Sequence, residues 1–293
     1  MAIKTHYGAA MYVPATHRDL RAISMGEKLT EVRNLIFCME DAVADHHLPH
    51  AYENLAAALL RLQRQAGVSR FIRPRDPESL AKILSMPGIE RIDGFVLPKF
   101  TGANAEFFLD SLAGTDFVIM PTLETLEVFE EHSMRSLCRD LSIVASKGSP
   151  AIAAMRIGGN DLLSLIGMRR PRGITIYDTP IGDVISSLVR VFKPQGFQLT
   201  APVFEHFEDE HTLAQELRRD LAHGLCGKTA IHPCQVDIIE RFYRVSDEDI
   251  ALARQMLDEA NPAVFKKHGT MCEPATHRHW AMEVLARAGT ADS

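Results

Sequence analysis

Short apolar runs alternate with amphipathic segments along most of the chain. The runs that predict strands cover residues 9–13, 34–39, 70–74, 94–99, 117–120, 153–157, 198–203 and 228–231. Segments with helical periodicity separate them, at about 16–26, 50–66, 77–85, 103–112, 127–145, 181–191 and 211–223. Strands of this kind that alternate with helices are typical of a parallel sheet covered by helices. The pattern predicts an α/β fold, a TIM-like (β/α)8 barrel over residues 1–245.

The pattern changes after residue 245. Residues 247–259 and 276–288 have helical periodicity, residues 262–268 look irregular, and no further strand is expected. We therefore expect a C-terminal helical extension, residues 246–293, outside the barrel. An arm of this kind packs on its own barrel or on a neighbouring subunit, and we expect this one at a subunit interface.

Ionisable residues stand at the ends of six predicted strands. They are Glu40 with Asp41, Arg73, Lys99, Glu124, Asp161 and His232. In a closed parallel barrel the C-terminal ends of the strands converge on one mouth, where the active sites of such barrels lie. The repeated pattern therefore indicates an enzyme whose active site is built from these side chains.

Glu124 and Asp161 are the candidate metal ligands. Mg²⁺ takes oxygen ligands, and it commonly uses one or two carboxylates while water and substrate oxygens complete the octahedron. The alternative is that each acid caps the helix that follows it, because a carboxylate stabilises a helix N-terminus. Two acids at neighbouring strand ends favour the metal site.

Arg73 is the candidate substrate contact. Its guanidinium suits a substrate carboxylate or a developing enolate oxygen, and a salt bridge to Glu40 or Asp41 is the structural alternative. One of these two acids is a candidate acid–base group while the other holds a loop, although a purely structural pair is the rival interpretation. Lys99 is interpreted as an ion-paired lysine rather than a Schiff-base lysine, and His232 as structural.

Composition excludes several classes of partner. A net charge of −6 gives no basic face for nucleic acid or an anionic membrane surface. No apolar stretch approaches the roughly 20 residues that span a bilayer, and the first residues lack the layout of a signal peptide. Five scattered cysteines suit reduced thiols in a cytoplasm.

Other motifs carry less weight. The segment from Gly227 to Thr229 lacks the upstream glycine of a P-loop, and no Gly-rich dinucleotide fingerprint follows the first strand. The histidines at positions 46, 47 and 50 have no companion ligand set. Residues 165–179 are read as a long loop over the mouth, and its basic run, residues 169–172, as solvated or as steering an anionic substrate.

Seven segments in order resemble those of one family. They are residues 11–15 (MYVPA), 38–43 (CMEDAV), 71–73 (FIR), 96–99 (VLPK), 122–125 (TLET), 158–162 (GGNDL) and 227–235 (GKTAIHPCQ). Together they resemble the citrate lyase β-subunit family, the CitE-like branch of the HpcH/HpaI aldolase and citrate lyase superfamily. The likeness runs over nearly the whole chain.

This resemblance implies a Mg²⁺-dependent barrel that cleaves a β-hydroxyacyl thioester of coenzyme A between two carbons, by a retro-aldol or retro-Claisen route. Substrates of the citryl-CoA, malyl-CoA or citramalyl-CoA type are implied, and so is a homo-oligomer, a trimer or hexamer. Carried over by position, Glu124 and Asp161 hold the metal, Glu124 and Arg73 contact substrate, and Glu40 and Asp41 support catalysis.

Three segments depart from the family pattern. Ala15 replaces a glycine, residues 200–203 replace an Asp-containing stretch, and residues 269–274 match the family arm in part. In some malyl-CoA lyase relatives an aspartate of that arm is the base of a neighbouring subunit's site, and Glu273 would take this role here. The alternatives are a metal-dependent aldolase on free 2-oxo acids and an inactive barrel within a larger complex.

Overall fold

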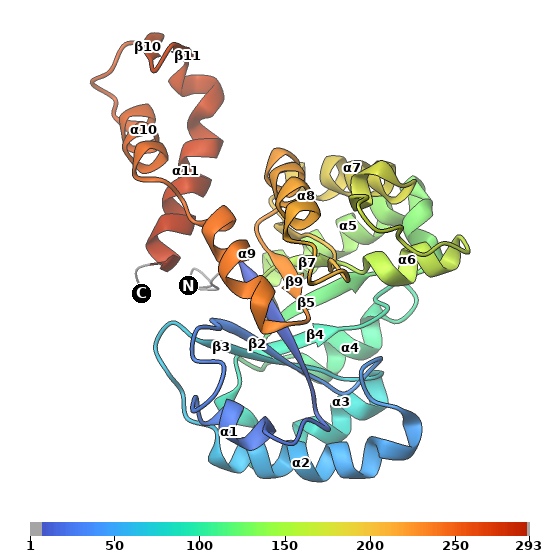
Figure 1. Ribbon diagram of the computed structural model, residues 1–293. Coiled ribbons are helices and arrows are strands. Elements are labelled where there is room, and N and C mark those ends of the chain that lie inside the picture. The colour runs from blue at the N-terminus through green and yellow to red at the C-terminus, as the bar shows by residue number, and fades with distance from the viewer. Residues whose placement is uncertain (1–7, 292–293) are drawn as a thin grey trace.

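Parallel strands form a barrel at the centre of the computed structural model, which describes residues 8–291 (Figure 1). The strands are β1 (Ala9–Pro14), β2 (Asn34–Cys38), β3 (Ser69–Arg73), β4 (Gly94–Leu97), β5 (Val118–Leu123), β6 (Ala151–Ile152), β7 (Met155–Ile157), β8 (Leu199–Thr200) and β9 (Lys228–Ala230). β6 and β7 share one position, because both pair with β5. β1 pairs with β9, and a parallel bridge between Ala201 and Lys228 closes the ring. The predicted eight-position barrel is confirmed.

The sixth position of the barrel contains a bulge. Ile119 pairs with Ile152, and Thr122 pairs with Arg156, so β5 advances three residues while the chain from β6 to β7 advances four. An extra residue in a strand reverses the side to which all later side chains point. Ala153 accordingly lies in the interior cluster, whereas Met155 and Ile157 pack outward against the helices. The expected continuous strand 153–157 is therefore interrupted.

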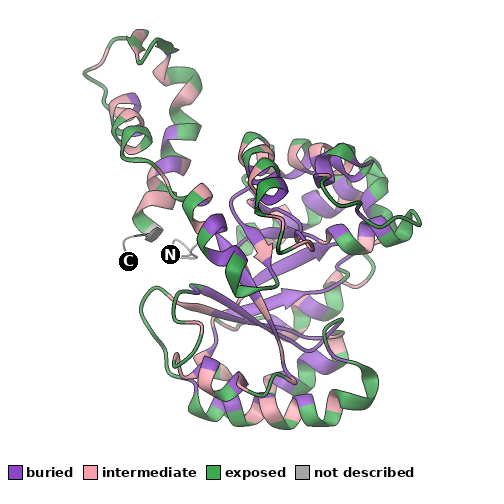
Figure 2. Ribbon diagram, in the orientation of Figure 1, coloured by how far each residue is buried: buried purple, intermediate pink, exposed green. Residues whose placement is uncertain are grey.

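Helices cover the outside of the barrel, and the main core lies between them and the strands (Figures 1 and 2). They are α1 (Leu20–Ser24), α2 (Leu48–Arg61), α3 (Pro77–Leu84), α4 (Ala105–Leu112), α5 (Glu131–Lys147), α6 (Gly159–Leu165), α7 (Ile181–Phe192), α8 (Glu210–Ala222) and α9 (Val236–Tyr243). The helix α7 illustrates why the core lies there. Four of its apolar residues recur on one face, and all four are buried: Ile181, Ile185, Leu188 and Phe192. No helix within residues 8–291 is long and apolar enough to span a bilayer.

A buried ionic cluster fastens α8 to the outer side of β9. Lys228 Nζ lies 2.8 Å from Glu216 Oε1 and 3.0 Å from Asp220 Oδ2, and all three side chains are fully buried. Arg170 Nη1 lies 2.6 Å from Glu216 Oε2, and the Tyr177 hydroxyl donates to Asp220 at 2.6 Å. The prediction of a solvated basic run is therefore wrong for Arg170, because this arginine compensates a carboxylate that α8 buries.

The C-terminal arm has a small core of its own. It comprises α10 (Asp247–Leu257), β10 (Phe265–Lys267), β11 (Thr270–Cys272) and α11 (Pro274–Ala291), and it projects away from the barrel (Figure 1). The expectation of no strand after residue 245 is wrong, because β10 and β11 form an antiparallel hairpin. His268 and Gly269, with φ values of 50° and 79°, supply the two-residue turn between them.

We predict that Lys228→Met strongly destabilises the fold. The substitution leaves Glu216 and Asp220 buried with less compensating charge, a loss that typically costs about 3 to 5 kcal/mol. Urea denaturation followed by circular dichroism measures this change in the free energy of unfolding. The control is Lys147→Met at the exposed end of α5, which should change stability by less than about 0.5 kcal/mol. Equal stability of the two variants would contradict the structural role of the cluster.

Candidate active site

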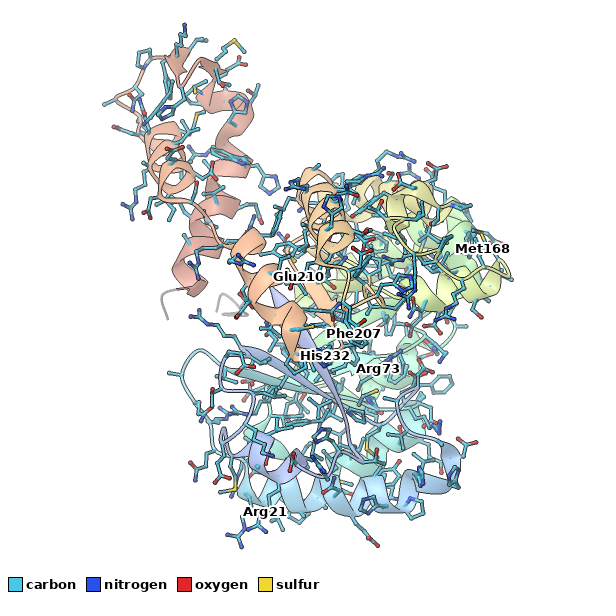
Figure 3. The ribbon with its side chains drawn as sticks, in the orientation of Figure 1. Arg21, Arg73, Met168, Phe207, Glu210 and His232 are labelled. Carbon is cyan, nitrogen blue, oxygen red and sulfur yellow. The ribbon has the colours of Figure 1, made fainter. Side chains whose placement is uncertain are left out.

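A cavity of about 420 Å³ opens where the C-terminal ends of the strands converge. Four of the side chains that were predicted from strand ends line it, namely Asp41, Arg73, Glu124 and Asp161. Figure 3 shows Arg73 near the middle of the molecule, with Phe207 and His232 next to each other. The topology therefore brings side chains from four separate strand ends to one cavity.

Arg73 contacts three carboxylates with one nitrogen. Its Nη2 lies 2.9 Å from Glu40 Oε2, 2.8 Å from Glu124 Oε1 and 3.5 Å from Asp41 Oδ2. Arg73 therefore forms the expected salt bridges and also lies on the cavity wall, where a substrate could contact it. Arg73 Nε is buried and has no acceptor among the described residues.

Glu40 and Asp41 face different surroundings. Glu40 is 3% exposed and lies behind Arg73, whereas Asp41 lines the cavity and its side chain is 54% exposed. Burial, followed by the hydrogen bond with Asp41, raises the pKa of Glu40 to about 7, although Arg73 and Lys99 oppose this shift. A carboxyl group that titrates near neutral pH is suited to proton transfer.

Lys99 and His232 have the structural surroundings that the sequence predicts. Lys99 Nζ forms ion pairs with Glu40 and, at 3.4 Å, with Asp41. His232 Nδ1 accepts a hydrogen bond from the Cys234 backbone and caps the short helix Pro233–Gln235. Its ring stacks on Phe207 with centroids 4.7 Å apart.

Glu124 presents one engaged oxygen and one that has no donor among the described residues. Its Oε1 accepts from Arg73 Nη2 and from the Lys99 backbone N–H, both at 2.8 Å. Next to Oε2 is Gly158, where a Cβ atom would come within 2.2 Å of that oxygen. A glycine at this position is therefore what allows the carboxylate to lie against the chain that leads into α6.

Asp161 lies in the first turn of α6, but its side chain does not cap that helix. The N-cap residue is Gly158, so Asp161 is not the N-cap residue, although a carboxylate in the first turn still stabilises the helix N-terminus. Burial, and then repulsion from Glu124 and Asp41, raises the pKa of Asp161 to about 6. Two mutually repelling carboxylates on one cavity wall form an arrangement that a bound cation relieves.

The donor set fits a hard divalent cation that keeps part of its water. Among residues 8–291 no three carboxylate, imidazole or thiolate side chains come together as a complete ligand set. Mg²⁺ does not need one, because it is usually held by one or two carboxylates together with water and substrate oxygens. Glu124 and Asp161 supply this minimal set.

Sequence reasoning missed Tyr12 and Arg156, which also line the cavity. Arg156 interrupts the apolar run from Ala151 to Ile157, and this interruption is a signal that could have been followed. Tyr12 has no comparable signal, because an aromatic residue is common in a strand. Arg73 and Arg156 lie 5.8 Å and 5.5 Å from the centre of the Tyr12 ring.

Two curated bacterial proteins are similar to the chain. A (3S)-malyl-CoA thioesterase from Cereibacter sphaeroides is 25% identical over 279 residues, which cover 92% of this chain and 88% of the relative. An L-malyl-CoA/β-methylmalyl-CoA lyase from Rhodobacter capsulatus is 25% identical over 256 residues, covering 80% and 78%.

A solved structure and a family model extend the comparison. CitE from Mycobacterium tuberculosis, solved with magnesium, acetoacetate and coenzyme A, superimposes with a TM-score of 0.68 at 20% identity and covers 98% of this chain and all of that one. This likeness concerns the fold. A model of C–C bond lyases of the TIM-barrel fold matches residues 1–291. The expected carbon–carbon lyase of the CitE-like type is therefore confirmed at the level of the family: the chain belongs to the C–C bond lyases of the TIM-barrel fold.

Proposed function

We propose that the protein is a Mg²⁺-dependent lyase that cleaves a β-hydroxyacyl-coenzyme A thioester between two carbons. The observation that carries this proposal is the Glu124–Asp161 pair on the wall of the cavity that Arg73 also lines. Carboxylates that repel each other hold a cation, and an adjacent guanidinium suits the anion that C–C cleavage generates. The malyl-CoA lyase of R. capsulatus and the magnesium and coenzyme A bound by CitE of M. tuberculosis support the same reaction class.

The chemistry follows from the charges at the mouth. The ion would act as a Lewis acid on the hydroxy-acid end of the substrate. Loss of the hydroxyl proton lets the C–C bond break, which gives an oxo acid and the enolate of the shorter thioester. Arg73 stabilises the developing enolate charge, and Glu40 fixes the guanidinium from behind. The enolate then takes up a proton to complete the reaction.

Glu273 is our candidate for the base, supplied by a neighbouring subunit. It lies on the arm immediately before α11, and Thr276 donates to its carboxylate at 3.1 Å. The arm contacts its own barrel through Gln198, which donates to Glu283 at 2.6 Å. Gln198 precedes β8, so this contact is at the end of the barrel opposite the mouth. The arm also exposes Met271 and Met282, which would be available to a neighbouring subunit.

Hydrolysis of the thioester is the second candidate, favoured by the thioesterase from C. sphaeroides. The products separate the two reactions, because lysis releases an oxo acid and keeps the thioester, whereas hydrolysis releases the free thiol of coenzyme A. We predict that citryl-, malyl- or citramalyl-CoA yields oxo acid only with Mg²⁺, and that the free hydroxy acids yield none. Release of thiol without oxo acid would contradict the lyase.

We predict that Asp161→Asn weakens Mg²⁺ binding at least about 100-fold while raising the melting temperature of the metal-free protein. The folded-state pKa lies above the ordinary value of 3.8, so the ionised carboxyl disfavours folding above that pH. Removing the charge of Asp161 should raise the melting temperature by about 2 °C. This value is reduced because the carboxyl is partly exposed to solvent, which screens its charge. Calorimetry and thermal denaturation provide the two measurements.

The matched control is Asp183→Asn, in the first turn of α7 outside the cavity. It should leave Mg²⁺ affinity unchanged. Undiminished Mg²⁺ binding by Asp161→Asn would place the metal elsewhere.

Magnesium affinity should depend on pH through Asp161. The ion competes with the proton that this carboxyl binds with a pKa of about 6. Affinity should therefore fall by about tenfold for each pH unit below 6 and level off above about 7. Calorimetric titration from pH 5 to pH 8 measures this profile, and a constant affinity across that range would contradict the assignment.

A further inference from the structure

Arg156 is a buried cation on the cavity wall, without a carboxylate partner in the part of the chain that the structure describes. It is 2% exposed, and no carboxylate oxygen among the described residues lies within 4 Å of its guanidinium. Its Nη2 donates to Thr229 Oγ1 at 2.6 Å, and its Nη1 lies 3.8 Å from Met120 Sδ. Arg73 and Arg170, which are also buried, each form ion pairs with carboxylates. A buried charge without a counter-charge is costly, and it indicates a place where an anion binds.

The bulge between β6 and β7 is what places Arg156 inside the barrel. Without the extra residue, the alternation that begins at Ala151 and Ile152 would turn Arg156 outward to the helices. With it, Arg156 is level with Thr122 of β5 and Thr200 of β8, and it points to the cavity. Bulges re-aim side chains in this way next to active sites.

Two unsatisfied hydroxyl groups belong to residues that are paired with Arg156 in the sheet. Thr122 Oγ1 and Thr200 Oγ1 are buried and have no hydrogen-bond partner among the described residues. Both threonines are direct register partners of Arg156 on the neighbouring strands. Hydroxyl groups can donate, so three adjacent strands bring a cation and two unused donors to one level of the barrel. Arg156, Thr122 and Thr200 therefore form a polar site, and their side chains do more than fill space in the core.

We propose that Arg156, with Thr122 and Thr200, binds a second carboxylate on the acyl part of the substrate. The proposal rests on the proposed lyase function and narrows its substrate to a dicarboxylic hydroxyacyl thioester, whose cleavage releases a dicarboxylic oxo acid. Glu124 follows Thr122 by two residues, so this candidate metal ligand lies about 7 Å nearer the mouth along the direction of β5. One carboxylate of the acid would then reach the Mg²⁺ ion held by Glu124 and Asp161, and the other would reach Arg156 deeper in the barrel.

The charge balance of the cavity supports a distal anion. Glu40, Asp41 and Glu124 already surround Arg73. Arg156 has no such partner within residues 8–291, and an acyl chain that ends in a methyl group would leave its charge unpaired. A site built for a polar group discriminates strongly against a substrate that lacks it.

Calorimetry with two oxo acids tests the subsite without any thioester. Oxaloacetate carries the second carboxylate, and 2-oxobutyrate carries a methyl group in its place. With saturating Mg²⁺, the unmodified protein should bind oxaloacetate at least about tenfold more tightly. In Arg156→Met this preference should fall to within about twofold, while 2-oxobutyrate affinity stays unchanged. Equal binding of the two acids by the unmodified protein, or no binding of either, overturns the proposal.

Two further variants separate charge recognition from damage to the fold. Arg139→Met removes an exposed arginine of α5 and should keep the full preference for oxaloacetate. Arg156→Lys keeps the charge and should retain part of the preference for oxaloacetate. If Arg156→Met keeps the full preference, the proposal is wrong. Preference for oxaloacetate without cleavage of any thioester would instead contradict the lyase and leave the subsite standing.

Discussion

The contact between Arg73 and three carboxylates is the interaction on which the mouth of the barrel depends. Arg73 ends β3, Glu40 and Asp41 follow β2, and Glu124 follows β5, so one guanidinium ties three strand ends together. Without this cation, the carboxylates would repel each other in a site that excludes much of the water. With it, Glu124 is fixed by Oε1 while Oε2 remains available to a ligand.

Charge is balanced on the outer side of the barrel wall and unbalanced inside. Between β9 and α8, Lys228 lies against two carboxylates, and this cluster is complete without any ligand. In the cavity, Asp161 has carboxylate neighbours, and Arg156 has no acidic partner among residues 8–291. Such imbalance disfavours the ligand-free fold, and it is typical of sites where stability is given up for binding. The two opposite excesses also suit a dicarboxylic ligand that binds through Mg²⁺ at one end and presents a free carboxylate to Arg156 at the other.

Strand–helix alternation was enough to predict the barrel, and charged strand ends were enough to predict four side chains of its cavity. Other features depend on partners that local sequence does not reveal. Arg170 stands in a run of basic residues, yet its partner Glu216 is 46 positions away. The hairpin of the arm consists of three-residue strands, which are too short for a period of two to be recognised.

Arg156 shows most clearly why the orientation of a side chain could not be predicted, although its charge within an apolar run was a visible signal. A period of two from Ala151 to Ile157 would place this residue on the outer face, among helices, where an arginine would be read as a structural cation. The direction reverses because the backbone accommodates one residue more than β5 does over the same distance. Strand register therefore determines which side of the wall carries the charge. Because that charge meets the buried end of the ligand, a bulge of one residue can set specificity. The chemistry is unchanged, because Glu124, Asp161 and Arg73 stay in place.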